Sequence, residues 1–231
     1  MTTTCPSGRR RRHSFIAGLA GVILALVPVV SLASPASARP VAAVGDPIAA
    51  AARAALDSLD QVEAVHADND TVRAAGLDGS VEQLVAKLHF AYDVKVLADL
   101  VAQRATVDPW KLYQVWSTES EQRMTAVFTA LAQVGKPYRS MSKGPDSFDC
   151  SGLLHFSWGA AGVAMGADSE QQIRAARAVK EGDLRPGDIV YHPGHVGLSL
   201  GVGHAIVHAE QTGQPVKVMD WARATKLGSP V

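Results

Sequence analysis

The chain has 231 residues, of which 22 are Lys or Arg and 22 are Asp or Glu, so its formal net charge is zero at pH 7. This balance gives no electrostatic argument for a nucleic acid partner, and the length predicts one domain of ordinary size plus an appendage. The sequence holds two cysteines and eight histidines without an HExxH pattern. We therefore expect neither a metal site nor an organic cofactor.

The first 38 residues predict a secretory signal peptide. Residues 9–12 are four arginines, residues 15–33 are mostly apolar, and Ala36-Ser37-Ala38 is a small-residue cleavage site. The alternative is a retained membrane anchor, which the length of the apolar stretch allows. Pro28 and the cleavage site favour removal. We expect a secreted chain that has no membrane attachment after cleavage.

Cleavage after Ala38 would leave one cysteine in the exported chain. Cys5 lies in the removed segment and Cys150 does not. The same segment contains four basic residues and no acidic one, so the remaining chain is acidic overall. Exported domains normally use cysteines in pairs, and an unpaired one is a candidate reactive thiol.

Residues 39–123 predict a helical region. Apolar residues recur every three or four positions from Ile48 to Val62 and from Val81 to Tyr92. Asp108-Pro109 predicts a helix N-cap followed by proline at the first helical position. Short helices with apolar stripes need a partner surface. We expect these helices to dock on the C-terminal domain and cover part of its groove; a spacer without chemistry is the alternative.

Asp149-Cys150 predicts the start of a buried helix. A turn-rich approach, residues 144–148, precedes it, and an apolar run with a spacing of three to four follows as far as Ala161. Asp149 is the expected N-cap. A thiol on the first turn of a helix lies among unpaired backbone N–H groups, which favour the thiolate. The alternative is an inert core cysteine.

The last hundred residues predict a helix followed by strands. Ser169-Glu170-Gln171-Gln172 has the pattern of a capping box, which predicts a helix from Ser169 through Val179. Residues 185–188 predict a turn before a strand. Gly201-Val202 suits the two-residue loop of a β-hairpin. The expected core face of this hairpin consists of Val196, Leu198, Leu200, Ala205 and Val207.

That hairpin places His195 directly opposite His208, on the more polar face. We expect Cys150 on the same face, with His195 between His208 and the thiol. Two paired histidines and an odd cysteine fit nucleophilic catalysis by a thiolate and an imidazole. The remaining histidines are expected to be packing, rim or loop residues, or to lie in the helical region without a partner: His66, His89, His155, His192 and His204.

The motifs of residues 124–231 resemble the NlpC/P60 family of cysteine peptidases. They are Gly135-Lys136-Pro137-Tyr138, Phe148-Asp149-Cys150-Ser151-Gly152-Leu153, Leu184-Arg185-Pro186-Gly187-Asp188-Ile189-Val190, Gly194-His195-Val196-Gly197 and His208-Ala209. The resemblance implies a papain-like α+β fold in which the cysteine-bearing helix packs on an antiparallel sheet, preceded here by the helical region.

The resemblance also implies a function and a site. It implies cleavage of peptidoglycan stem peptides, at the bond between D-γ-glutamate and a diamino acid, by a secreted or cell-wall monomer. Cys150 would be the nucleophile, His195 the general base and His208 the orienting residue. Tyr138 would line the oxyanion side, and Asp149 and Ser151 would be polar groups that face the substrate.

Two alternatives stay open at this stage. One is a wall-binding module that keeps the fold without catalysis. The other is a different amide hydrolysis or an acyl transfer on the same scaffold. The presence of all three expected catalytic residues favours the peptidase.

Overall fold

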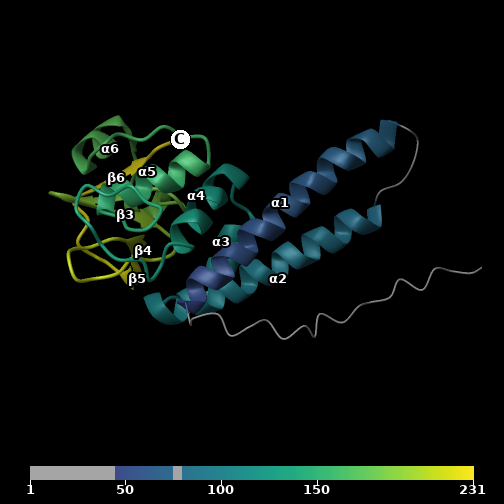
Figure 1. Ribbon diagram of the computed structural model, residues 1–231, viewed down its shortest axis with the longest axis horizontal. Helices are drawn as coiled ribbons and strands as arrows, with labels where there is room; N and C mark the ends of the chain where they lie inside the picture. The colour runs from purple at the N-terminus through teal and green to yellow at the C-terminus, as the bar shows by residue number, and fades with distance from the viewer. Residues whose placement is uncertain (1–44, 75–79) are drawn as a thin grey trace, which may run out of the picture. The chain divides into compact units, whose positions relative to one another are not determined.

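The computed structural model describes residues 45–74 and 80–231 (Figure 1). The predicted signal peptide, with Cys5, lies outside the described residues. No helix in the described part of the chain is long and apolar enough to cross a membrane.

Two long helices open the described chain. Helix α1 (Pro47–Ala74) and helix α2 (Ser80–Ala105) pack against each other along their length (Figure 1). Helix α3 (Pro109–Ser117) follows, and the Asp108 side chain accepts hydrogen bonds from the backbone N–H groups of Trp110 and Lys111. The predicted cap and the proline at the first helical position are therefore confirmed.

The helical pair docks on the rest of the fold. Helix α1 contacts α4 (Glu121–Leu131), where the Arg53 guanidinium donates to the Ala132 carbonyl at 3.1 Å. The Phe90 ring meets the Phe128 ring edge to face at 6.4 Å. Helix α2 contacts α3 and strand β5 (Lys217–Asp220). One apolar core thus runs through both predicted regions, and the expected docking is present.

The docking contacts run to α3, α4 and β5, and the expected cover over the groove stays a prediction. Among the hydrogen bonds of the described residues, none joins α1 or α2 to Cys150, His195 or His208. The helical pair therefore supports the core from the α4 side.

The second helical pair lies next to the sheet. Helix α5 (Cys150–Ala160) begins at the cysteine, as predicted, and α6 (Ser169–Ala175) follows. The helix begins at Ser169, as predicted, but the predicted cap and the predicted end were wrong. Its N-cap is Asp168, whose carboxylate accepts from the Gln171 N–H at 2.8 Å. Its end comes at Ala175, because the next residues turn extended and pair with a strand.

Six antiparallel strands form one sheet in the order β1-β6-β2-β3-β4-β5. A short 3-10 helix, η1 (Glu181–Asp183), precedes β2. The other strands are β1 (Arg177–Ala178), β2 (Ile189–His192), β3 (His195–Ser199), β4 (Ala205–His208) and β6 (Lys226–Ser229). The predicted α+β fold, with a cysteine-bearing helix packed on an antiparallel sheet after a helical region, is confirmed.

The β3–β4 hairpin has a longer loop than predicted. Leu198 pairs with Val207, and the Leu200 N–H donates to the Ala205 carbonyl at 2.9 Å. Residues 201–204 therefore form a four-residue loop, with Gly201 and Gly203 both at positive φ. His195 is consequently not directly opposite His208. A shift of two positions leaves every side chain on its predicted face, because side chains alternate with a period of two.

The two faces of the sheet are covered differently. Leu153 and Trp158 of α5 share the main core with Val196 and Leu198. The cysteine-bearing helix thus packs on the apolar face of the hairpin. The other face carries a smaller apolar cluster of Val190, Ile206 and Trp221.

Candidate active site

Cys150 is held by the loop that precedes it. The Asp149 carboxylate accepts from the Gly152 N–H at 2.6 Å and from the Ser151 hydroxyl at 3.1 Å. The Asp149 N–H donates to the Ser142 carbonyl at 2.8 Å. That carbonyl approaches so closely that a Cβ on Gly152 would lie 2.1 Å from its oxygen. The first turn of α5 and the loop before it are therefore fixed to each other.

These bonds give Asp149 and Ser151 a structural role. The Asp149 carboxylate is engaged as the helix cap, and the Ser151 side chain is buried and bonded to it. Both side chains therefore help to hold Cys150, through Oδ1 of Asp149. Their expected contact with the substrate stays a prediction.

The thiol lies against the start of β3. The backbone N–H groups of Val196, the residue after His195, and of Ser151 and Cys150 lower the pKa of the thiol. Burial acts in the opposite direction and is the largest effect, so the pKa of the Cys150 thiol is raised. The helix terminus supplies the expected donors, but they do not outweigh desolvation. The expected lowering of the thiol pKa is therefore not observed.

His195 and His208 meet across β3 and β4. The Nε2 atom of His195 lies 2.9 Å from Nδ1 of His208, and the two rings are inclined at 79°. Trp221 packs edge to face on His195, with ring centroids 5.2 Å apart, and also contacts His208. The histidines are thus neighbours, as predicted, and an indole holds their rings in place.

Both imidazoles are poor proton acceptors in the resting structure. Burial lowers the pKa of His195, and burial together with the charge of His195 lowers the pKa of His208 to about 4. His208 is 1% exposed, and within the described residues its Nε2 atom has no hydrogen-bond partner. At neutral pH the site therefore contains a thiol and two neutral imidazoles.

Tyr138 lies near the thiol. Burial raises the pKa of its hydroxyl, and the charges of Cys150 and Asp149 raise it further. The expected role of Tyr138 on the oxyanion side stays a prediction.

The other histidines have the packing and rim positions expected of them. A ring nitrogen of His155 lies 3.1 Å from the Met165 carbonyl oxygen, and one of His192 lies 3.1 Å from the Arg223 carbonyl oxygen. His204 is in the hairpin loop, 2.9 Å from a Glu181 carboxylate oxygen. The side chain of His66 lies outside the described residues.

Sequence reasoning missed two residues that support the site. Trp221 comes from the segment after β5, and no motif marks it. The buried Gln172 amide donates to the Ser151 carbonyl at 2.8 Å and so ties α6 to the first turn of α5. Gln172 stood in the predicted capping box, but its contact exists only once α6 docks.

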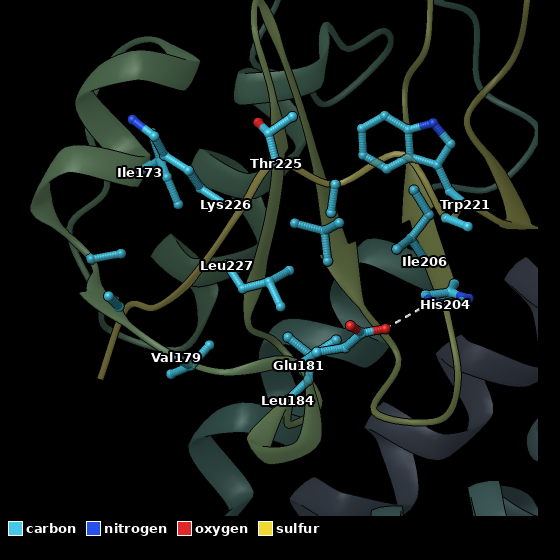
Figure 2. Close-up of a pocket in the computed structure, with 15 residues that line it drawn as sticks. Ile173, Val179, Glu181, Leu184, His204, Ile206, Trp221, Thr225, Lys226 and Leu227 are labelled. Atoms are coloured by element: carbon cyan, nitrogen blue, oxygen red, sulfur yellow. Dashed lines mark hydrogen bonds and ion pairs between the residues drawn. The ribbon is translucent and has the colours of Figure 1, made fainter.

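A cavity of about 440 Å³ lies on the second face of the sheet (Figure 2). Val190, Ile206, Trp221 and Leu227 line it, and the Glu181–His204 pair stands at its rim. Cys150, His195 and His208 do not line this cavity. Only Trp221 is shared between the cavity and the histidine pair.

Comparison with known proteins identifies this site's family. Residues 135–225 match the NlpC/P60 family, and this range includes Cys150, His195 and His208. The chain carries an NlpC/P60 domain. The predicted recognition, made from the motifs, is therefore confirmed.

Curated relatives match the same part of the chain. A probable endopeptidase of Mycobacterium tuberculosis is 36% identical over 100 residues, which are 42% of this chain and 26% of the relative. A probable endopeptidase p60 of Listeria grayi is 30% identical over 100 residues, or 39% of this chain and 20% of the relative. The chain thus matches about a quarter or less of the length of these relatives.

Solved NlpC/P60 structures resemble the domain. The NlpC/p60 domain of the peptidoglycan hydrolase SagA is 30% identical, with a TM-score of 0.43, over 46% of this chain and 97% of that domain. The P60 domain of an antigen from M. avium subspecies paratuberculosis is 27% identical, with a TM-score of 0.43, over 48% of this chain and 96% of that domain.

Proposed function

We propose that this protein is a secreted peptidoglycan hydrolase that cleaves stem peptides by a Cys-His-His mechanism. The observation that carries the proposal is the bond between His195 Nε2 and His208 Nδ1, formed beside a helix-terminal cysteine. The NlpC/P60 match and the relatives named as endopeptidases support the reaction class. We further propose the D-γ-glutamyl–diamino acid bond as the target and the cell wall as the location.

His208 sets the orientation of His195 in this mechanism. With Nε2 of His195 engaged by His208, its Nδ1 is the ring nitrogen left for the thiol. The Nε2–H of His195 then donates to Nδ1 of His208, which requires a neutral His208. The depressed pKa of His208 keeps it neutral across the physiological range. His208 thus fixes the tautomer in which His195 serves as a base.

The chemical step begins with proton transfer from a neutral thiol. His195 takes the proton from Cys150 as the sulfur attacks the peptide carbonyl, because the raised thiol pKa disfavours a free thiolate. The backbone N–H of Cys150 and the Tyr138 hydroxyl would stabilise the oxyanion. Loss of one such donor typically costs about 10²–10³ in rate. The imidazolium then protonates the leaving amine, and water hydrolyses the thioester.

Digestion of purified peptidoglycan tests the proposal. Mass spectrometry of the released fragments should show new termini at the glutamyl–diamino acid bond with the wild-type protein and none with Cys150→Ala. A His155→Asn variant, altered outside the site, should cleave normally. Binding to the wall without any cleavage by the folded wild type would refute the enzyme and favour the wall-binding alternative. Cleavage of a different amide bond would refute the assigned bond.

A further inference from the structure

Four ionisable side chains lie at or just beyond one end of β3, β4 and β5: His195, His208, Glu210 and Lys217. His208 pairs with Lys217 across β4 and β5. The β3–β4 register, in which Leu198 pairs with Val207, brings residue 210 opposite residue 195 when it is continued past the end of β4. Because paired residues share a face, Lys217 lies on the face of His208, and the ion pair with Lys217 holds Glu210 beside it.

Glu210 and Lys217 form an ion pair beside the two histidines. The Lys217 ammonium donates to the Glu210 carboxylate at 2.5 Å, and their side chains are 28% and 40% exposed. The Glu210 charge raises the pKa of both histidines, whereas Lys217 lowers that of His208. The other charge acting on His195 is His192, which lowers its pKa. The pair therefore places opposite charges next to the proposed base.

We propose that Glu210 is a positioning residue that stabilises the imidazolium formed on His195 when Cys150 gives up its proton, and that Lys217 limits this effect. The inference rests on the proposed proton transfer from Cys150 to His195. Neither residue needs to touch the substrate.

The need for such a residue follows from burial. Burial raises the pKa of the thiol and lowers that of His195, so transfer of the proton is uphill in the resting site. A carboxylate close to the imidazole stabilises the charged product, since opposite charges a few ångströms apart attract most strongly where water is scarce. Lys217 already offsets part of the negative charge of the Glu210 carboxylate. Removing Glu210 should therefore make the proton transfer less favourable, and removing Lys217 should make it more favourable.

The pH dependence of thiol alkylation tests this inference without requiring hydrolysis. Iodoacetamide would be added to the full chain, and labelling would be followed by mass spectrometry on the peptide that contains Cys150. Glu210→Gln should shift the acid limb of the profile to lower pH by roughly 0.5–1 unit and lower the plateau rate roughly 3- to 10-fold. Lys217→Met should shift the acid limb to higher pH and raise the plateau.

The ion pair of Lys95 and Asp99 on α2 provides a matched control. It is also a partly exposed Lys–carboxylate pair, with an N–O distance of 2.6 Å. Asp99→Asn and Lys95→Met make the same changes in net charge and should leave the profile unchanged. Shifts of Glu210→Gln and Lys217→Met in the same direction, or no shift in either, would overturn the inference. Glu210→Asp should restore part of the wild-type profile.

The same measurement separates this inference from the proposed function. Opposite shifts in alkylation without any release of wall fragments would support Glu210 as a positioning residue and refute the hydrolase. Cleavage of peptidoglycan with an unchanged alkylation profile in both variants would support the hydrolase and refute the role of Glu210. If the Glu210→Gln variant does not fold, the direction in which Lys217→Met shifts the acid limb of the alkylation profile still tests the inference.

Discussion

His195 and His208 hydrogen bond through Nε2 and Nδ1 at 2.9 Å although they are not directly opposite each other in the sheet. Gly197 is opposite His208 when the β3–β4 register is continued, and a Cβ on Gly197 would lie 3.5 Å from the His208 Cβ. A side chain at Gly197 would first meet Ile206, because its Cβ would lie 2.7 Å from the Ile206 Cδ1 atom. The bond between the two histidines is thus a diagonal contact across β3 and β4.

His208→Ala should lower the rate of stem-peptide hydrolysis on the order of 10²-fold, because His195 loses the acceptor that holds its ring and tautomer. His208→Asn keeps an acceptor and should lose less. Steady-state kinetics on a soluble stem peptide would show the effect in kcat with KM nearly unchanged. Equal loss in both variants would contradict an orienting role.

The stability of the fold should fall as the pH drops from about 6.5 to 4. The pKa of His208 is about 4 in the folded protein and near 6.5 when unfolded, so the unfolded chain binds more protons in this window. The full effect is on the order of 3 kcal/mol in the free energy of unfolding. Urea unfolding at pH 7 and pH 4.5 measures it, and His208→Asn should flatten the dependence. An equally steep loss in that variant would assign the effect to other groups.

Gly152→Ala should destabilise the protein and impair the site. The added Cβ would lie 2.1 Å from the Ser142 carbonyl oxygen and would push the loop away from the first turn of α5. Such overpacking typically costs about 1–3 kcal/mol. Thermal unfolding and the alkylation rate of Cys150 would report the two effects.

Gly159 on the same helix is the control for this substitution. A Cβ there meets nothing within 4 Å. Gly159→Ala should therefore be neutral or stabilise the helix by up to about 1 kcal/mol. A similar loss of stability in both variants would assign the effect to α5 as a whole instead of the Ser142 contact.

The helical pair should stabilise the NlpC/P60 domain instead of covering its groove. Leu97 of α2 is fully buried in the common core, whereas Leu88 on the same helix is 59% exposed. Leu97→Ala should cost about 2–5 kcal/mol in the free energy of unfolding, and Leu88→Ala about 0.5 kcal/mol or less. Denaturant unfolding monitored by tryptophan fluorescence would compare them.

A chain that begins at Asp108, and so lacks α1 and α2, is a stronger test of whether these helices stabilise the domain. It would expose the surface of α4 around Phe128, which packs against Phe90 of α2. We expect a lower melting temperature and a lower rate on a soluble stem peptide than for the chain with both helices. A shortened chain that is equally stable and faster would instead restore the cover hypothesis.

The sequence by itself determined the local chemistry of the site. A cap residue before a cysteine and an apolar helical run was enough to place Cys150 on the first helical turn, because capping is a short-range interaction. The alternation of apolar residues placed His195 and His208 on one face of the hairpin. That conclusion survived a register error of two positions, since an even shift leaves each side chain on its face.

Only the tertiary structure decided how these pieces are arranged and how they ionise. Helix α5 packs on the apolar face of the hairpin because Leu153 and Trp158 are buried against it. The spacing of residues along the chain does not predict which face of the sheet a helix covers. The direction of the thiol pKa depended on burial, which distant segments create and which outweighed the helix terminus. Lys217 reaches His208 through the pairing of β4 with β5, and Glu210 and Trp221 follow the ends of these two strands. Their place beside the site therefore depended on how β4 and β5 pair.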